Sequence, residues 1–229
     1  MRPYTYVVIN SKVRPSETYY PRPSQKKQRL LATKHSTSTI LAGFTGDTRT
    51  VNQALRSPIP EQRCAALGAA ARIGFLDAAT LRPFLDDGSS NVVYRAIELV
   101  ARIPDGVVLA AELPALLQRA QFAEVTAFVL GELGVVDGLI VDALSQQARS
   151  HEDPLCRESA VAALGALGEG LGTVLDATSD VATVRRRAVI CLAAFEGKDV
   201  DAALQRALTD RDWQVRQAAE DLVTADEEE

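Results

Sequence analysis

An internal repeat of about thirty residues constrains this chain more than any other feature of its sequence. From Ser57 onward, an anchor residue is followed by a small residue three positions later and by apolar residues seven and ten positions later. The anchors lie 28 to 34 residues apart and are Arg63, Val93, Ala123, Arg157, Arg185 and Arg216. Offsets of 3, 7 and 10 fall on one stripe of an α-helix, because each residue advances about 100° around the axis. Each of the six units therefore contains one amphipathic helix.

A second apolar segment lies between successive anchored helices. These segments cover residues 78–85, 107–117, 136–144, 171–177 and 200–208. Turns rich in Pro, Asp and Ser precede the anchored helices, and Gly74, Gly134 and Gly168 follow three of them, as helix caps do. Each unit is thus a helical hairpin, and hairpins of this size must stack to bury their apolar stripes. The sequence predicts an all-α fold, a right-handed α-solenoid of about six stacked hairpins.

Several of these units resemble HEAT repeats. The resemblance is carried by Asp-Arg-Asp-Trp-Gln-Val-Arg-Gln-Ala-Ala at 210–219 and by Arg-Glu-Ser-Ala-Val-Ala-Ala-Leu-Gly-Ala-Leu-Gly at 157–168, and it covers residues 50–224. It is similar to the short HEAT-like type of the phycobilin lyase subunits. The resemblance implies that the anchored helix is the second of each pair and lines the concave face. It also implies that the recurring arginine joins a ladder with aspartates of the inter-helix turns, interrupted at Val93 and Ala123.

Charge divides the chain into a basic and an acidic part. Residues 1–56 hold ten Lys and Arg against two acids, a formal charge of +8, and the remainder carries −13. Because prolines are frequent at the start of the chain, no stable helix is expected there. We expect a basic, disordered and irregular arm over residues 1–49, the HEAT-repeat solenoid over residues 50–224, and an acidic C-terminal tail over residues 225–229.

Composition indicates a cytoplasmic protein. Hydrophobic residues make up 47% of the chain, but no apolar run reaches the roughly 20 residues of a membrane span. Residues 1–30 lack the apolar stretch of a signal peptide. Cys64, Cys156 and Cys191 are an odd number at wide spacing, which favours reduced structural thiols over a disulfide framework. Cys156 stands at a helix start, where its pKa could be lowered.

The sequence predicts no catalytic residue, no metal site and no cofactor. His35 lies in the arm, and His151 lies beside Glu152 in a turn before a helix. Di-iron enzymes built from similar HEAT-like repeats carry several His-Glu pairs, because two metal ions need a full set of converging ligands. This chain offers one pair, so we reject di-iron chemistry. Trp213, the only tryptophan, is expected to pack the end of the stack as part of a cap.

A partner would contact the face opposite the packed stripes, near offsets 1, 5, 8 and 12 from each anchor. We select six candidate partner-binding residues on this concave face: Tyr94, Glu98, Glu124, Phe128, Glu158 and Arg186. Tyr94 and Phe128 are the expected anchors, with packing against a neighbouring helix as the alternative for each. Because carboxylates dominate the face, we expect a protein partner with a basic surface or peptide. The basic arm itself is one such peptide.

These observations favour a non-enzymatic scaffold that binds another protein along its concave face. The first alternative is a HEAT-like lyase or lyase-chaperone subunit for a tetrapyrrole or similar modification, as the resemblance implies. The second alternative is nucleic-acid binding through the basic arm. We expect no nucleic-acid partner for the solenoid itself, because a body with a charge of −13 repels phosphates. Nothing in the sequence sets the oligomeric state.

Overall fold

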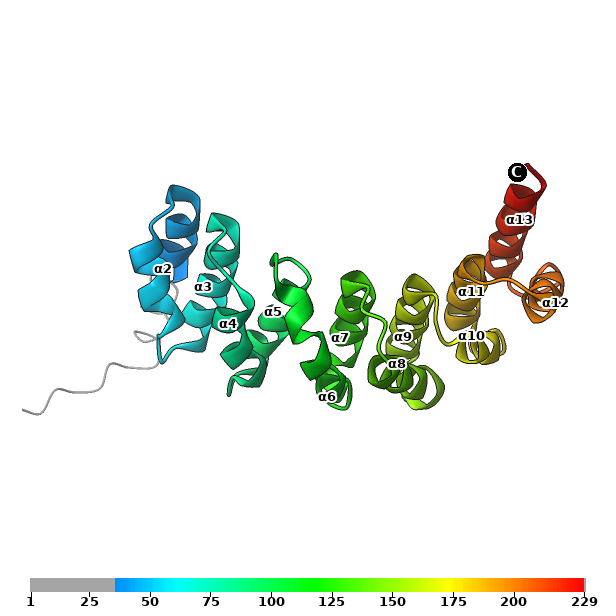
Figure 1. The fold of residues 1–229 in the computed structure, drawn as a ribbon, viewed down its shortest axis with the longest axis horizontal. Helices are drawn as coiled ribbons and strands as arrows, with labels where there is room; N and C mark the ends of the chain where they lie inside the picture. The colour runs from blue at the N-terminus through cyan, green and yellow to red at the C-terminus, as the bar shows by residue number, and fades with distance from the viewer. Residues whose placement is uncertain (1–35, 229) are drawn as a thin grey trace, which may run out of the picture.

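The structure is a computed structural model that describes residues 36–228, with side chains as far as residue 224. Helices follow one another through this range, and no strand occurs within it. Figure 1 shows the helical hairpins side by side along a shallow arc, with the second helix of each hairpin on its inner side. The predicted all-α solenoid is confirmed.

Each hairpin pairs a first helix with an anchored second helix. The first helices are α2 (Thr48–Leu55), α4 with the 3-10 segment η1 (Ala78–Leu81 and Arg82–Asp86), η2 with α6 (Gly106–Glu112 and Pro114–Leu117), α8 (Gly138–Ser150), α10 (Leu171–Ala177) and α12 (Lys198–Ala207). The second helices are α3 (Pro60–Ile73), α5 (Ser90–Val100), α7 (Ala120–Leu133), α9 (Pro154–Leu167), α11 (Ala182–Cys191) with η3 (Leu192–Ala194), and α13 (Trp213–Glu228). Second helices pack against second helices of neighbouring units, so the hairpins stack in chain order.

The helical stack begins earlier than residue 50. Residues 36–45 form a helix, although we expected them to belong to an irregular arm. Ala42 is buried, and a Cβ placed on Gly43 would lie 2.8 Å from the Cβ of Ala69. This helix therefore covers the side of α3 that would otherwise end the stack. The remainder of the expected arm, residues 1–35, lies outside the described residues.

The second correction concerns the C-terminal end. We expected a separate acidic tail over residues 225–229, but α13 continues without a break to Glu228. Helix α13 starts at Trp213 and contains no Gly or Pro, and the absence of such breakers lets the helix propagate through the acidic segment. Residue 229 lies outside the described residues.

Cap residues set the ends of many helices. Five aspartates that directly precede a helix accept a hydrogen bond from a backbone N–H of its first turn: Asp47, Asp77 and Asp137 before first helices, and Asp153 and Asp212 before second helices, where the sequence predicts caps. Three glycines end second helices in the left-handed region, with φ of 83° at Gly74, 63° at Gly134 and 67° at Gly168. Residues other than Gly rarely adopt this backbone conformation, so these glycines end α3, α7 and α9 at equivalent positions in their units.

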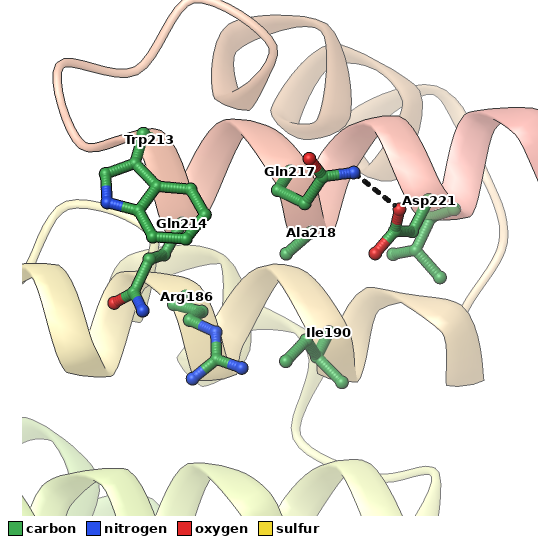
Figure 2. Close-up of a pocket in the computed structure, with 8 residues that line it drawn as sticks. Arg186, Ile190, Trp213, Gln214, Gln217, Ala218 and Asp221 are labelled. Carbon is green, nitrogen blue, oxygen red and sulfur yellow. Dashed lines mark hydrogen bonds between the residues drawn. The ribbon is translucent and has the colours of Figure 1, made fainter.

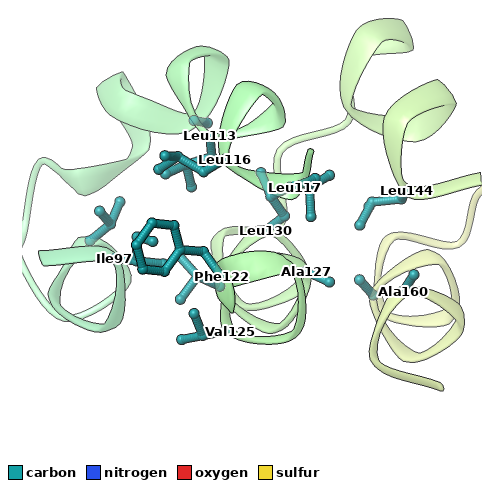
Figure 3. Packing of buried hydrophobic residues seen from close by; sticks show 14 of the residues in the cluster. Ile97, Leu113, Leu116, Leu117, Phe122, Val125, Ala127, Leu130, Leu144 and Ala160 are labelled. Carbon is teal, nitrogen blue, oxygen red and sulfur yellow. The ribbon is translucent and has the colours of Figure 1, made fainter. Parts of the chain in front are cut away.

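The core runs continuously along the stack between the two rows of helices. All six small residues at offset 3 are completely buried: Ala66, Ala96, Thr126, Ala160, Ala188 and Ala219. In the middle of the stack, the ring of Phe122 on α7 lies beside Ile97 of α5, and leucines of α6 lie above it (Figure 3). Each hairpin is therefore buried largely by its neighbours.

The closest approach between second helices occurs at offsets that the sequence pattern did not single out. A Cβ on Gly131 of α7 would lie 3.0 Å from the Cα of Ala163 on α9. A Cβ on Gly165 of α9 would lie 2.5 Å from Sγ of Cys191 on α11. Both glycines stand at offset 8 and face offset 6 of the next unit. Gly is required at these two positions because the packed helices leave no room for a side chain, and not because the backbone needs an unusual conformation.

An arginine ladder links successive units. Arg157 donates from Nε and Nη2 to both carboxylate oxygens of Asp180, each at 2.7 Å, and from Nη1 to the carbonyl oxygen of His151 at 2.8 Å. Arg63 with Asp87 and Arg185 with Asp210 repeat this bidentate geometry. Each aspartate also accepts a backbone N–H within its own turn. The aspartates lie one unit further along the chain, so the ladder holds neighbouring hairpins in register.

The ladder is interrupted where the sequence lacks the arginine. Val93 and Ala123 are both completely buried, so apolar contacts replace the ion pair in these units. The buried side chain of Gln147 takes over part of the linkage. Its Nε2 donates to the carbonyl oxygens of Ala123 at 3.2 Å and Cys156 at 2.8 Å, which connects α7, α8 and α9.

Removing one carboxylate of the ladder tests its energetic role. We expect Asp180→Asn to lower the free energy of unfolding at pH 7 by about 1–3 kcal/mol, because it leaves the half-buried Arg157 without its charged partner. Hydrogen bonds from Arg157 hold the pKa of Asp180 below its usual value. The Arg157–Asp180 pair therefore contributes fully to stability above the pKa that Asp180 has in the unfolded chain. This contribution is lost as the pH falls through the lower pKa that Asp180 has in the folded protein. Denaturant titrations of both proteins should therefore differ at pH 7 and converge in acid.

Asp176→Asn is the matched control for this prediction. Asp176 lies in the same unit as Asp180 and also pairs with an arginine of the preceding unit, Arg149, but both side chains are more than half exposed, at 66% for Asp176 and 51% for Arg149. Exposed ion pairs contribute little, so the control should change stability by less than about 0.5 kcal/mol. Equal effects of the two substitutions would contradict a structural role for the ladder.

The close approach of α9 and α11 generates a second prediction. Gly165→Ala should destabilise the protein by about 1–3 kcal/mol, because the new methyl group overlaps Cys191, and this outweighs the gain of about 1 kcal/mol in helix propensity. In Gly172→Ala, on α10, the new methyl group meets no atom within 4 Å, so the same chemical change should stabilise the protein. Thermal unfolding of both variants measures the contrast, and a stabilised Gly165→Ala would contradict the tight packing.

Candidate functional site

The best-formed site among the sequence-predicted residues is a pocket between α5 and α7, called here the α5–α7 pocket. It has a volume of about 310 Å³. Tyr94, Glu98, Ala101 and Arg102 line it from α5 and its C-terminal end, Glu124, Val125, Phe128, Val129 and Glu132 from α7, and Ser159 from α9. Four of the six predicted partner-binding residues thus come together in one place.

Helix periodicity places these side chains on the open face. Tyr94 and Glu98 are offsets 1 and 5 from Val93, and Glu124 and Phe128 are the same offsets from Ala123. Their neighbours toward the core are fully buried, as the Val93 and Ile97 side chains show. Because adjacent units stack in register, equal offsets of α5 and α7 lie side by side.

The aromatic walls of the pocket are open to solvent. Tyr94 is 42% exposed and Phe128 is 59% exposed. The alternative expectation, that Phe128 packs against a neighbouring helix, is therefore wrong. Aromatic side chains exposed in a concavity supply a large contact area to a ligand at a small cost in conformational entropy.

The electrostatic character of the α5–α7 pocket is acidic. Within the described residues, Glu124 and Glu132 form no ion pair, whereas Glu98 accepts a hydrogen bond from Arg95 at 3.0 Å. Burial raises the pKa of Tyr94, and the nearby charges of Glu98 and Glu124 raise it further, so its phenol stays protonated at neutral pH. Three glutamates face one arginine, Arg102. The pocket therefore favours cations.

Sequence reasoning missed three polar residues of this pocket. Arg102 and Glu132 stand at offset 9 from their anchors, which continues the series of offsets 1 and 5 along the same stripe. The prediction took offset 8 for this turn of the helix and therefore passed over both residues. Ser159 comes from the next unit, where its hydroxyl donates to the carbonyl oxygen of Glu124 at 2.9 Å. No periodic signal within α5 or α7 points to it.

The other two predicted residues do not join the α5–α7 pocket. Glu158 accepts hydrogen bonds from Nε and Nη2 of Arg187 at 3.4 and 3.3 Å. Arg186 lines a separate pocket of about 320 Å³ between α11 and α13, called here the α11–α13 pocket (Figure 2).

Trp213 also lines this second pocket and is 64% exposed. The expectation that Trp213 packs the end of the stack is therefore wrong, because Val215 and Ala219, on the other side of α13, provide that contact.

The cysteines and histidine lie outside both pockets. All three thiols are free, and burial raises the pKa of Cys156, contrary to the lowering expected at a helix start. Desolvation outweighs the helix N-terminus there, and it raises the pKa of Cys191 to about 11. Nδ1 of His151 accepts a hydrogen bond from the backbone N–H of Asp153 at 3.1 Å. Among the residues that the structure describes, no group of three His, Cys, Asp or Glu could hold a metal ion.

Comparison with known proteins identifies the class of fold. The chain matches no protein-family model and no curated protein sequence. It is similar to the X-ray structure of YibA from Escherichia coli, with 15% identity and a TM-score of 0.53 over 88% of this chain and 75% of that chain. Human deoxyhypusine hydroxylase, solved in complex with glycerol, matches with 19% identity and a TM-score of 0.42 over 86% of this chain and 81% of that chain. The fold is that of a HEAT-like helical-repeat protein.

The expectation of a non-enzymatic scaffold does not stand. Function resides in a site and not in the architecture that carries it, so a helical-repeat fold does not exclude enzymatic activity. The sequence contains no apolar run long enough for a membrane span, and no helix within residues 36–228 is both long and apolar enough to cross a bilayer.

The exposure of Phe128 can be tested against a core residue of the same helix. Phe128→Ala should change the free energy of unfolding by less than about 0.5 kcal/mol, because the ring is 59% exposed. Phe122→Ala, in which a ring that is 1% exposed is removed, should cost about 3–5 kcal/mol. Denaturant unfolding of both variants measures the difference. A large loss for Phe128→Ala would show that the ring belongs to the core.

Proposed function

We propose that the chain is a HEAT-like lyase or lyase-chaperone subunit that holds a basic segment of a protein substrate in the α5–α7 pocket while the substrate is modified. The observation that carries this proposal is the combination of two exposed aromatic rings, Tyr94 and Phe128, with glutamates that have no ion-pair partner among the described residues. The resemblance of the repeats to lyase subunits supports the reaction class, and the lining of the pocket supports the substrate class.

The charges of the pocket favour a lysine or arginine side chain as the bound group. A cation beside Glu124 or Glu132, which lie about two helical turns apart on α7, gains a carboxylate partner that is otherwise solvated. Its aliphatic stem can lie along the Phe128 ring, while the charged head can also approach the face of Tyr94. Each of these interactions is modest, but they act on the same side chain.

The same charges argue against the pigment itself as the occupant. Bilin-type tetrapyrroles carry carboxylate groups, which three glutamates in one pocket would repel. Within the lyase and lyase-chaperone class, the pocket therefore supports holding the acceptor protein over holding the pigment. Nucleic-acid binding through the arm rests on residues 1–35, which lie outside the described residues.

A peptide-binding experiment tests the proposal. A fluorescently labelled Lys-Arg peptide should bind the full chain, and Glu124→Gln should weaken binding about 5- to 10-fold, because one charged partner is lost. Binding should also weaken as salt concentration rises. Glu196→Gln is the matched control, since it removes the same charge from an exposed residue outside the pocket and should leave affinity unchanged.

Biliverdin provides the competing probe. If the pigment bound with a visible absorption shift, and Glu124→Gln strengthened that binding, the pocket would hold the pigment and the proposal would be wrong. If Glu124→Gln and Glu196→Gln lowered the peptide affinity equally, the proposal would also be wrong, because binding would then depend on net charge alone.

A further inference from the structure

The α11–α13 pocket differs in charge from the α5–α7 pocket although it lies on the same row of second helices. Arg186 and Ile190 line it from α11, and Trp213, Gln214, Gln217 and Asp221 line it from α13. Figure 2 shows Trp213 and Gln214 on the side of α13 that faces Arg186. The two pockets are separated by α9, and no residue lines both.

The only acidic group of the α11–α13 pocket is already engaged, whereas its cation is not. The carboxylate of Asp221 accepts a hydrogen bond from Nε2 of Gln217 at 2.8 Å. Arg186 is exposed and forms no hydrogen bond or ion pair within the described part of the chain. Its two neighbours are both engaged, Arg185 with Asp210 and Arg187 with Glu158. Arg186 is therefore the guanidinium that α11 leaves available for an anion.

Two apolar side chains in the wall around Arg186 are exposed. The indole of Trp213 is 64% exposed, and Ile190 is 37% exposed. A ligand that suits the pocket combines an anionic group for Arg186 with an apolar group that can lie against Trp213 and Ile190. An acidic residue next to a hydrophobic residue in a peptide has this chemistry.

We infer that the α11–α13 pocket binds a carboxylate of the same protein substrate whose basic segment occupies the α5–α7 pocket. The inference rests on the proposed function and deepens it, because it assigns a direction to the substrate. Adjacent packed helices lie about 8–10 Å apart, so three helix spacings separate the pockets by roughly 24–30 Å. An extended chain covers this distance in about eight residues. The substrate segment would therefore carry its basic and acidic ends about eight residues apart.

Trp213 provides a local reporter, because it is the only tryptophan of the chain. The probe is a peptide with Lys-Arg at one end, a Gly-Ser spacer of about eight residues and Leu-Glu at the other end. The comparison peptide ends in Leu-Gln, and both peptides are amidated at the C-terminus, so they differ only in the side-chain carboxylate. We expect the Leu-Glu peptide to shift Trp213 emission and to bind more tightly than the Leu-Gln peptide, which should leave the emission unchanged.

Variants of the full chain assign the effect to Arg186. Arg186→Gln should weaken binding of the Leu-Glu peptide about 10-fold and leave the Leu-Gln peptide unaffected, because only the charged contact is removed. Arg211→Gln is the matched control, since Arg211 is exposed and lies two residues before Trp213 but does not line the pocket. Circular dichroism confirms that each variant remains folded.

The outcomes separate this inference from the proposed function. If both peptides bound equally, Trp213 emission did not change and Glu124→Gln weakened binding, the second site would be overturned and the proposed function would stand. A Trp213 response that depends on Arg186 but not on Glu124 would retain the carboxylate site and overturn the proposed function together with the shared substrate. Equal losses in Arg186→Gln and Arg211→Gln would also overturn the second site.

Discussion

The apolar stripe of each second helix is wider than its own hairpin can cover, and the next hairpin supplies the missing surface. Ala66, Ala96 and Ala160 are completely buried because the rows of helices meet at these positions. The helix over residues 36–45 provides the same cover at the start of the stack. Stacking in chain order then brings equal offsets of adjacent units together, so each exposed position becomes part of a row along one face.

The arginine ladder holds this register, and its interruption coincides with the α5–α7 pocket. Arg157 and Arg185 bind aspartates of the following unit, which leaves little freedom for sliding between hairpins. The units that lack the arginine, anchored at Val93 and Ala123, are the two that carry Tyr94 and Phe128. Packing and Gln147 replace the ion pairs there. A site placed where a repeated structural rule is broken is typical of functional positions.

Periodicity explains which features the sequence predicts and which it does not. The hairpins, their caps and the residues of offsets 1 and 5 follow from spacing alone, since a helix repeats every 3.6 residues. Thr39 and Ala42 were not predicted to be helical because the charge and prolines of the preceding segment dominated that interpretation. Contacts between units were also missed: the hydroxyl of Ser159 on α9 and the approach of Gly165 to Cys191 depend on helix separation, which one chain's spacing does not report.

The exposure of Trp213 shows how a stack can end without a dedicated cap. Helix α13 buries Val215 and Ala219 against the preceding unit and leaves its other face open. Arg186 then lies at the edge of that open face, beyond the glutamates of the middle units. The α5–α7 pocket carries glutamates without an ion-pair partner among the described residues, and the α11–α13 pocket carries such an arginine, so a ligand with one basic and one acidic end is favoured in only one direction. Directional binding of this kind lets a repetitive fold present one chosen segment of a substrate to a reaction.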